Sequence, residues 1–233
     1  MTVLLVDCRL REAYLDGHVP GSVHLDREHD LTGEIGDASR GRHPLPTAGA
    51  FATAAGRAGI GEATFVLACD AGDGWAHRLW WLLRHFGHDA AGTFDLRGYA
   101  GPLEIGEKTS GSATFVPRER DDDTISAEEI HARLGDPTLV LADARAPERW
   151  RGDVEPLDPV AGRIPGARNA FFEAPLPEGL LEAPEIAFYC GSGVTACVPL
   201  QRLVLAGRDD VRLYPGSFSE WCRRDDYPIE RGE

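Results

Sequence analysis

The chain has 233 residues, 42% hydrophobic and 27% charged, which suits one large globular domain or two of ordinary size. Its net charge of −14 argues against nucleic-acid or anionic-membrane binding, since both need clustered Lys and Arg. Five widely spread cysteines, an odd number, indicate free thiols in a reducing compartment rather than a disulfide framework. The sequence shows neither a signal peptide nor a membrane-spanning run, so we expect a cytoplasmic protein.

The first half of the chain predicts an α/β domain. "LLVDCR" (4–9) is an apolar strand that ends in Asp-x-Arg, and "GHVPGSVHLD" (17–26) adds a turn and a second strand. "TFVLACDAGDGWAHRLWWLLRHFGH" (64–88) predicts a buried strand, a six-residue loop and a helix that is ended by Gly87. "DLRGY" (95–99) closes the pattern.

The stretch that follows has the composition of a linker. "GPLEIGEKTSGSATFVPRERDDDT" (101–124) is rich in Gly, Ser and Thr and ends in an acidic run. "TISAEEI" then predicts a helix start, with Ser126 as N-cap and Glu129 at the capping-box position. We therefore predict a first domain, a linker and a second domain at residues 1–105, 106–123 and 124–233.

The second half repeats the first in the same order. "LVLADAR" (139–145), "GRIPGARNAFF" (162–172), "EIAFYCGSGVTACVPLQRLVLAGR" (185–208) and "LYPGSF" (213–218) parallel the four blocks of the first half. Four matching blocks in register indicate a tandem duplication. Because strands alternate with helices, each copy is predicted to be a mostly parallel sheet flanked by helices.

A cysteine opens the strand-to-helix loop of the second copy, which runs from Cys190 to Thr195. Ligands of open parallel sheets bind beyond the carboxyl ends of the strands, where this loop is expected to lie. Gly191 and Gly193 allow successive backbone N–H groups to point inward as an anion-binding nest, next to the positive end of a helix. Such a nest favours a thiolate or a persulfide on Cys190.

The other four cysteines are interpreted as ordinary buried or structural residues; they are Cys8, Cys69, Cys197 and Cys222. In the first copy the position aligned with Cys190 is Asp70, whose carboxylate cannot carry a sulfane sulfur. A Cys-x5-Arg phosphatase loop is a further alternative. Ala196 stands where its arginine would be, so phosphoryl transfer would lack its main charge partner.

These motifs together resemble the two-domain rhodanese sulfurtransferases. The resemblance rests on the tandem copies and on "GHVPG", "GRIPG", "DCR", "DAR", "AHRLWWLLRHFGH" and "CGSGVTA", and it covers nearly the whole chain. Within the family, the Cys190 loop is similar to that of 3-mercaptopyruvate sulfurtransferases, whereas thiosulfate-using members usually carry a basic Cys-Arg-Lys-Gly loop. The resemblance implies a catalytic second domain and a first domain that lacks the catalytic cysteine.

The resemblance also implies a mechanism. The Cys190 thiolate takes sulfur from a small-molecule donor, and the persulfide passes to a thiol acceptor such as thioredoxin, or to cyanide in an assay. Ser192 resembles the family serine that relays a proton, with His43 of "RHPLP" and Glu28 of "LDREHD" as its partners. Asp26 is the alternative to Glu28, and a solvated loop histidine is the alternative for His43. No metal and no organic cofactor are implied.

Donor binding is assigned by the same resemblance. Arg149 of "ARAPERWRG" matches a family arginine that holds the substrate, although a surface arginine on a short helix is the alternative. A second family arginine falls near Leu157, so Arg163 is considered as its substitute. The loop residues completing the predicted substrate contacts are Gly191, Gly193, Val194 and Thr195. Two other functions stay open, a thiosulfate:cyanide sulfurtransferase and a persulfide carrier for a biosynthetic partner.

Overall fold

The computed structural model describes residues 1–109 and 111–232, and the chain forms two compact units. The first unit contains Met1–Gly33 and Leu45–Arg120, and the second contains Glu34–Pro44 and the chain from Asp121 onward. Residues 34–44, which the sequence placed in the first domain, therefore pack with the second unit. The packing of this segment matters for the site because His43 lies in it.

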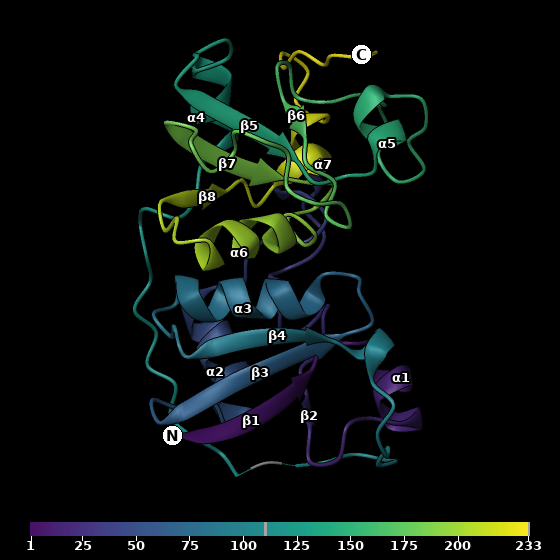
Figure 1. Cartoon of the computed structure of the whole chain (residues 1–233), viewed down its shortest axis with the longest axis vertical. Coiled ribbons are helices and arrows are strands. Elements are labelled where there is room, and N and C mark those ends of the chain that lie inside the picture. The colour runs from purple at the N-terminus through teal and green to yellow at the C-terminus, as the bar shows by residue number, and fades with distance from the viewer. Residues whose placement is uncertain (110, 233) are drawn as a thin grey trace. The chain divides into compact units, whose positions relative to one another are not determined.

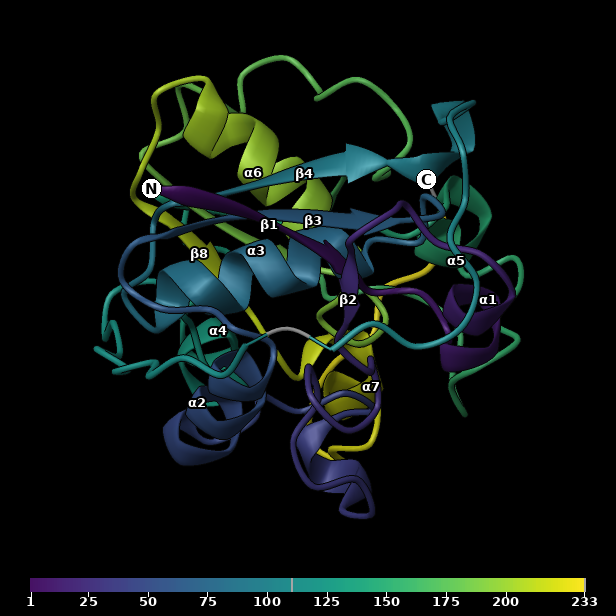
Figure 2. The same ribbon diagram turned by 90° about the horizontal axis from the view of Figure 1, so that it is seen from below.

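The first unit is built on a parallel sheet with the strand order β2-β1-β3-β4. Figure 2 shows β1, β3 and β4 running in one direction. Its strands are β1 (Thr2–Asp7), β2 (Val23–His24), β3 (Thr64–Asp70) and β4 (Ala91–Asp95). Its helices are α1 (Arg11–Asp16), α2 (Ala48–Arg57), α3 (Trp75–His85) and the short η2 (Leu96–Gly98). Trp80 and Trp81 of α3 are buried, as a core helix face requires.

The second unit repeats this plan with the strand order β6-β5-β7-β8 (Figure 1). Its strands are β5 (Leu139–Asp143), β6 (Arg168–Asn169), β7 (Glu185–Tyr189) and β8 (Val211–Leu213). Its helices are η1 (Ala38–Arg40), α4 (Ala127–Ala132), α5 (Pro147–Arg151), α6 (Cys197–Leu205) and α7 (Ser217–Trp221). Ser126 caps α4 as predicted, since its Oγ accepts the Glu129 N–H at 3.1 Å. Across residues 1–109 and 111–232, none of the helices has the length and apolarity needed to cross a bilayer.

Each unit fixes the end of its first strand with the same ionic clamp. In the second unit, Arg145 Nη2 donates to Asp143 Oδ2 at 2.6 Å and to the carbonyl oxygen of Gly162 at 2.7 Å. In the first unit, Arg9 Nη2 donates to Asp7 Oδ2 and to the carbonyl oxygen of Gly17 at the same two distances. The clamp ties the Asp-x-Arg strand end to the glycine of "GHVPG" or "GRIPG", so these arginines form ion pairs at the strand ends.

Part of the predicted linker 106–123 packs on the first unit. The Ala113 N–H donates to the carbonyl oxygen of Gly56 at 2.9 Å, and the buried Phe115 ring meets Phe51 edge-on at a centroid distance of 5.5 Å. Composition alone indicated a free linker. One buried aromatic ring and a few backbone hydrogen bonds are enough to fix such a segment to a domain.

The clamp gives a stability prediction with an internal comparison. The Arg145→Ala variant leaves the fully buried Asp143 without its cation, and we expect a loss of about 3–5 kcal/mol in the free energy of unfolding. Arg9→Ala is expected to cost less, because the Arg9 side chain is 19% exposed, against 1% for Arg145, so water solvates that clamp. Urea unfolding followed by circular dichroism measures both. Equal losses in the two variants would contradict this account.

Candidate active site

The loop after β7 is held from behind by the first turn of α7. The Cys190 N–H donates to Ser217 Oγ at 3.1 Å, and the Cys190 and Gly191 carbonyl oxygens accept the N–H groups of Phe218 and Ser219, both at 3.0 Å. Ser217 has a φ of 55°, a left-handed conformation that is uncommon for a residue other than glycine. Both sides of the cysteine backbone are thus fixed by one neighbouring turn.

Two backbone N–H groups of this loop point at the sulfur of Cys190. Those of Gly193 and Ser192 lie 3.2 Å and 3.5 Å from Sγ. Gly193 has a φ of 76°, and a Cβ there would lie 2.4 Å from the carbonyl oxygen of Pro215, so only glycine fits. This arrangement is the predicted nest, and it favours negative charge on the sulfur.

Val194 and Thr195 link the nest to α6. Their carbonyl oxygens accept the N–H groups of Cys197 and Val198, both at 3.1 Å. The sequence predicted loops of equal length in the two copies, but α6 begins later than α3 does relative to the aligned residues. In the second copy the N–H groups that point at Sγ belong to Ser192 and Gly193, before the helix, whereas in the first copy one of the N–H groups on Asp70 belongs to Ala76 of α3.

The side chain of Ser192, in this loop, lies within hydrogen-bonding distance of His43. His43 Nδ1 lies 2.8 Å from Ser192 Oγ, and Ser192 is buried. Gly41, with a φ of 81°, would place a Cβ only 2.5 Å from the carbonyl oxygen of Gly216, so glycine permits the close approach of this segment. The Ser–His pair suggested by the resemblance is therefore present within the second unit.

Two guanidinium groups lie over Gly191. A Cβ at Gly191 would be 2.6 Å from Arg42 Nη2 and 3.4 Å from Arg149 Nη2. Arg149 also donates to Glu155 Oε1 at 2.7 Å. Arg149 was predicted at this place, whereas Arg42 was missed, although its position next to His43 in the sequence was a usable signal.

Comparison with known proteins decides the family. Residues 1–99 and 126–224 each match the rhodanese-like domain family. The chain belongs to the rhodanese family. This rhodanese is 37% identical, over 99% of its own length and 93% of the other's, to the Pseudomonas aeruginosa protein named "Probable 3-mercaptopyruvate sulfurtransferase".

Two further relatives span the same length. SseB of Mycobacterium tuberculosis, provisionally named a thiosulfate sulfurtransferase, is 34% identical over 100% of this rhodanese and 91% of its own chain. The structure of the 3-mercaptopyruvate sulfotransferase SseA from Escherichia coli superposes with a TM-score of 0.77 at 26% identity. That match covers 93% of this rhodanese and 92% of SseA. The tandem rhodanese fold predicted from the sequence is thereby confirmed.

Arg163 is held away from this group of residues by contacts of its own. Its guanidinium donates to Glu230 Oε1 and to the carbonyl oxygen of Gly232, both at 2.5 Å, and stacks on the Trp150 ring at 3.9 Å. That Arg163 takes the role of the second substrate arginine stays a prediction. Arg42, which lies over Gly191, is the better-placed guanidinium.

Glu28 belongs to the first compact unit and is exposed. Its backbone N–H donates to Asp26 Oδ1 at 2.9 Å, and the same oxygen lies 2.9 Å from His29 Nδ1. Asp26 is thus engaged by its own turn. The support of His43 by Glu28 stays a prediction.

The first copy fills the equivalent nest with its own carboxylate. Asp70 accepts the N–H groups of Gly72 and Ala76, both at 2.8 Å, and Ala76 lies in the first turn of α3. The strand register pairs Cys69 with Asp7 and Tyr189 with Asp143, which confirms the expected offset of the first-copy cysteine. Asp70 occupies the place where the second copy holds a sulfur.

The remaining cysteines are poor nucleophiles. Burial raises the pKa of the Cys8, Cys69 and Cys222 thiols, and neighbouring carboxylates add to the effect. Cys197 donates its S–H to the carbonyl oxygen of Gly193 at 3.5 Å. Since the thiolate is the reactive form, these four cysteines are expected to stay out of the chemistry.

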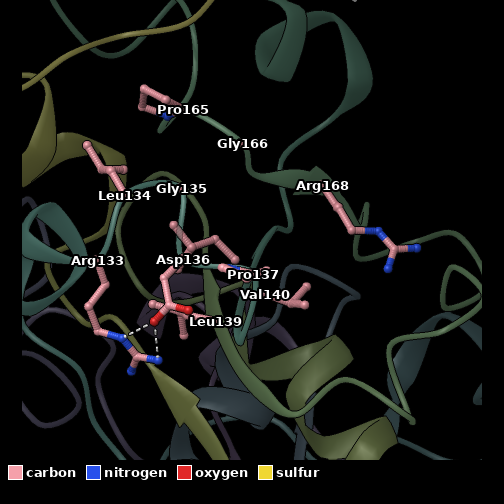
Figure 3. A pocket seen from close by; sticks show the side chains of 11 residues that line it. Arg133, Leu134, Gly135, Asp136, Pro137, Leu139, Val140, Pro165, Gly166 and Arg168 are labelled. Carbon is pink, nitrogen blue, oxygen red and sulfur yellow. Dashed lines mark hydrogen bonds and ion pairs between the residues drawn. The ribbon is translucent and has the colours of Figure 1, made fainter.

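A cavity of about 250 Å³ lies at the opposite end of the second sheet (Figure 3). Its lining includes Pro137, Leu139, Val140 and Leu141 at the start of β5, whereas Cys190 follows the end of β7. Arg133 on its wall is paired with Asp136 and Glu185. Among the described residues, no three His, Cys, Asp or Glu side chains are grouped so that they could hold a metal ion.

The nest gives a prediction for Gly193. In the Gly193→Ala variant the loop must shift away from Pro215, which removes an N–H donor from Sγ. We expect thiocyanate formation from a sulfane donor and cyanide to fall by about 10²-fold, as for the loss of one donor to a reacting charge. Gly135→Ala is the matched control, because Gly135 has a φ of 82° but a Cβ there meets nothing within 4 Å. A similar loss in both variants would rule out a special role for the nest.

Proposed function

We propose that this rhodanese-family sulfurtransferase takes sulfur from 3-mercaptopyruvate and carries it as a persulfide on Cys190. The observation that carries the proposal is the convergence of two backbone N–H groups on Sγ beside a Ser192–His43 pair. The Pseudomonas aeruginosa and Escherichia coli relatives, both named for this donor, support it.

The first step moves one sulfur atom. The Cys190 thiolate attacks the donor sulfur and forms an S–S bond, while the C–S bond of mercaptopyruvate breaks and its electron pair stays on the departing carbon. The product at that stage is the enolate of pyruvate. The two N–H donors favour the negative charge on the cysteine sulfur before the attack and on the persulfide after it.

The second requirement is a proton for the enolate. With His43 Nδ1 protonated, its N–H donates to Ser192 Oγ across the 2.8 Å separation, so Ser192 can give its hydroxyl proton to the enolate while His43 replaces it. Protonation through Ser192 converts the enolate into pyruvate. The proton released by the persulfide S–H restores the balance, so the step consumes no external acid.

The persulfide then returns to the thiolate. Cyanide takes the outer sulfur as thiocyanate; a dithiol such as reduced thioredoxin takes it with formation of a disulfide and release of hydrogen sulfide. We propose a thiol acceptor of this kind and a cytoplasmic location, supported by the five free cysteines of the chain. The chemistry needs no organic cofactor, because the cysteine itself carries the sulfur.

Thiosulfate is the second candidate donor. It is supported by the Mycobacterium tuberculosis relative and by the two guanidinium groups over Gly191, which suit any anionic donor. A persulfide carrier for a biosynthetic partner would use the same nest without rapid turnover of a small donor.

Donor choice is tested by cyanide-trapped thiocyanate formation with each donor. We expect a higher kcat/KM for 3-mercaptopyruvate and complete loss of activity in Cys190→Ser. Mass spectrometry of the donor-treated enzyme should place the added sulfur on Cys190 and leave the other four cysteines unmodified. A thiosulfate preference would favour the second candidate, and activity that survives Cys190→Ser would overturn the mechanism.

The proton relay predicts a donor-dependent defect. Ser192→Ala and His43→Gln should each lower kcat with 3-mercaptopyruvate by roughly 10²–10⁴-fold, the usual contribution of general acid–base catalysis. With thiosulfate the leaving group is sulfite, a stable anion that needs no proton, so the same variants should change kcat little. Stopped assays with both donors provide the comparison. An equal loss with the two donors would indicate damage to the loop rather than to a relay.

A further inference from the structure

Arg42 comes from a segment far from Cys190 in sequence, yet its guanidinium lies at the loop. Arg42 Nη2 is the atom nearest to the position of a Gly191 Cβ, at 2.6 Å, and Arg149 Nη2 and Nη1 follow at 3.4 and 3.5 Å. Any side chain at position 191 would collide with Arg42. The missing Cβ therefore lets two guanidinium groups approach the loop backbone directly beside the nucleophile.

The position of Arg42 is fixed at both ends of the residue. Its backbone N–H donates to Ser219 Oγ at 3.0 Å, and Nη1 forms an ion pair with Asp158, whose side chain is fully buried. Asp158 has other cations as well, Arg223 Nη1 at 3.2 Å and Arg149 Nη2 at 3.5 Å. Asp158 thus anchors one edge of the Arg42 guanidinium, while Nη2 faces Gly191.

The charges around the loop do not cancel. Arg149 pairs with Glu155, and Arg145, which also touches Glu155, is matched by the carboxylate of its own clamp. In the part of the chain that the structure describes, the ion pairs of Arg42, Arg149 and Arg223 involve two carboxylates, Glu155 and Asp158. In a chain with a net charge of −14, one uncompensated positive charge beside the nucleophile is a local site for an anion.

We propose that Arg42 is a donor-binding residue that holds the carboxylate of the keto-thiol together with Arg149. This inference rests on the proposed function and extends it to a residue of the first-half sequence. In 3-mercaptopyruvate only the keto carbon and the methylene separate the carboxylate from the sulfur. A carboxylate bound over Gly191 therefore directs the sulfur toward the adjacent Cys190, and bidentate guanidinium contacts fix its orientation.

A purely structural arginine predicts a different behaviour. If Arg42 served only to neutralise Asp158, its loss would resemble the loss of Arg223, since both guanidinium groups contact the same Asp158 oxygen. The Arg42 and Arg223 side chains are also similarly exposed, at 25% and 27%. Arg223 is therefore a matched control that shares the carboxylate but is not among the nearest atoms over Gly191.

The test compares Arg42→Ala, Arg42→Lys and Arg223→Ala with two donors, 3-mercaptopyruvate and the neutral keto-thiol mercaptoacetone. We expect Arg42→Ala to raise KM for 3-mercaptopyruvate by roughly 10- to 100-fold, with kcat changed less than about threefold. Arg42→Lys should recover part of that loss, because it restores the charge but not the fork. KM for mercaptoacetone should be unchanged in every variant. Arg223→Ala should raise KM for 3-mercaptopyruvate much less than Arg42→Ala does, because it lowers the local positive charge without removing a donor over Gly191.

Direct binding gives a second readout that does not depend on turnover. Pyruvate titrated calorimetrically into Cys190→Ser should bind at least tenfold more tightly than into Cys190→Ser/Arg42→Gln, where glutamine keeps most of the side-chain volume. Equal pyruvate affinities, or equal KM changes for Arg42→Ala and Arg223→Ala, would overturn the role of Arg42. A wild-type enzyme that is inactive with 3-mercaptopyruvate would instead overturn the proposed function.

Discussion

The arrangement of the candidate active site in the second unit depends on two backbone N–H groups that point at one sulfur atom. They converge because Gly193 adopts a left-handed φ against Pro215 and because Ser217, itself left-handed, fixes the Cys190 backbone from behind. The parallel sheet places the loop beyond the carboxyl ends of its strands, where ligands of such sheets bind. The Ser192–His43 pair and the guanidinium groups over Gly191 have functional meaning only because the sulfur is held at that point.

The duplicated fold shows what the same nest does without a sulfur. In the first unit the Asp70 carboxylate accepts the loop N–H groups, and the helix α3 starts at Trp75. In the second unit the same place holds the Cys190 sulfur, so the N–H groups can stabilise negative charge that develops on sulfur during a reaction. Both copies keep the Asp-x-Arg clamp, which ties down the end of the first strand of each sheet.

Most of this could be predicted from the sequence, because local patterns encode it. The duplication, both sheets, the Ser126 cap and the nest around Cys190 follow from strand patterning, capping residues and glycines at fixed spacing. The basic lining of the nest could not be predicted in this way. The loop itself carries no arginine; the family resemblance placed Arg149 beside it, whereas Arg42 reaches it from another segment and was not predicted. Such convergence depends on tertiary packing, which local sequence patterns do not encode.

The placement of residues 34–44 has an evolutionary consequence. Because this segment lies between two parts of the first unit in sequence but packs with the second, the first half contributes a segment to the second unit. A gene fragment encoding only the second repeat would retain the nucleophile but would lose His43 and Arg42. Selection on the reaction would therefore preserve the first repeat even though its own loop carries Asp70. The first domain is then retained because it supplies residues 34–44 to the second unit.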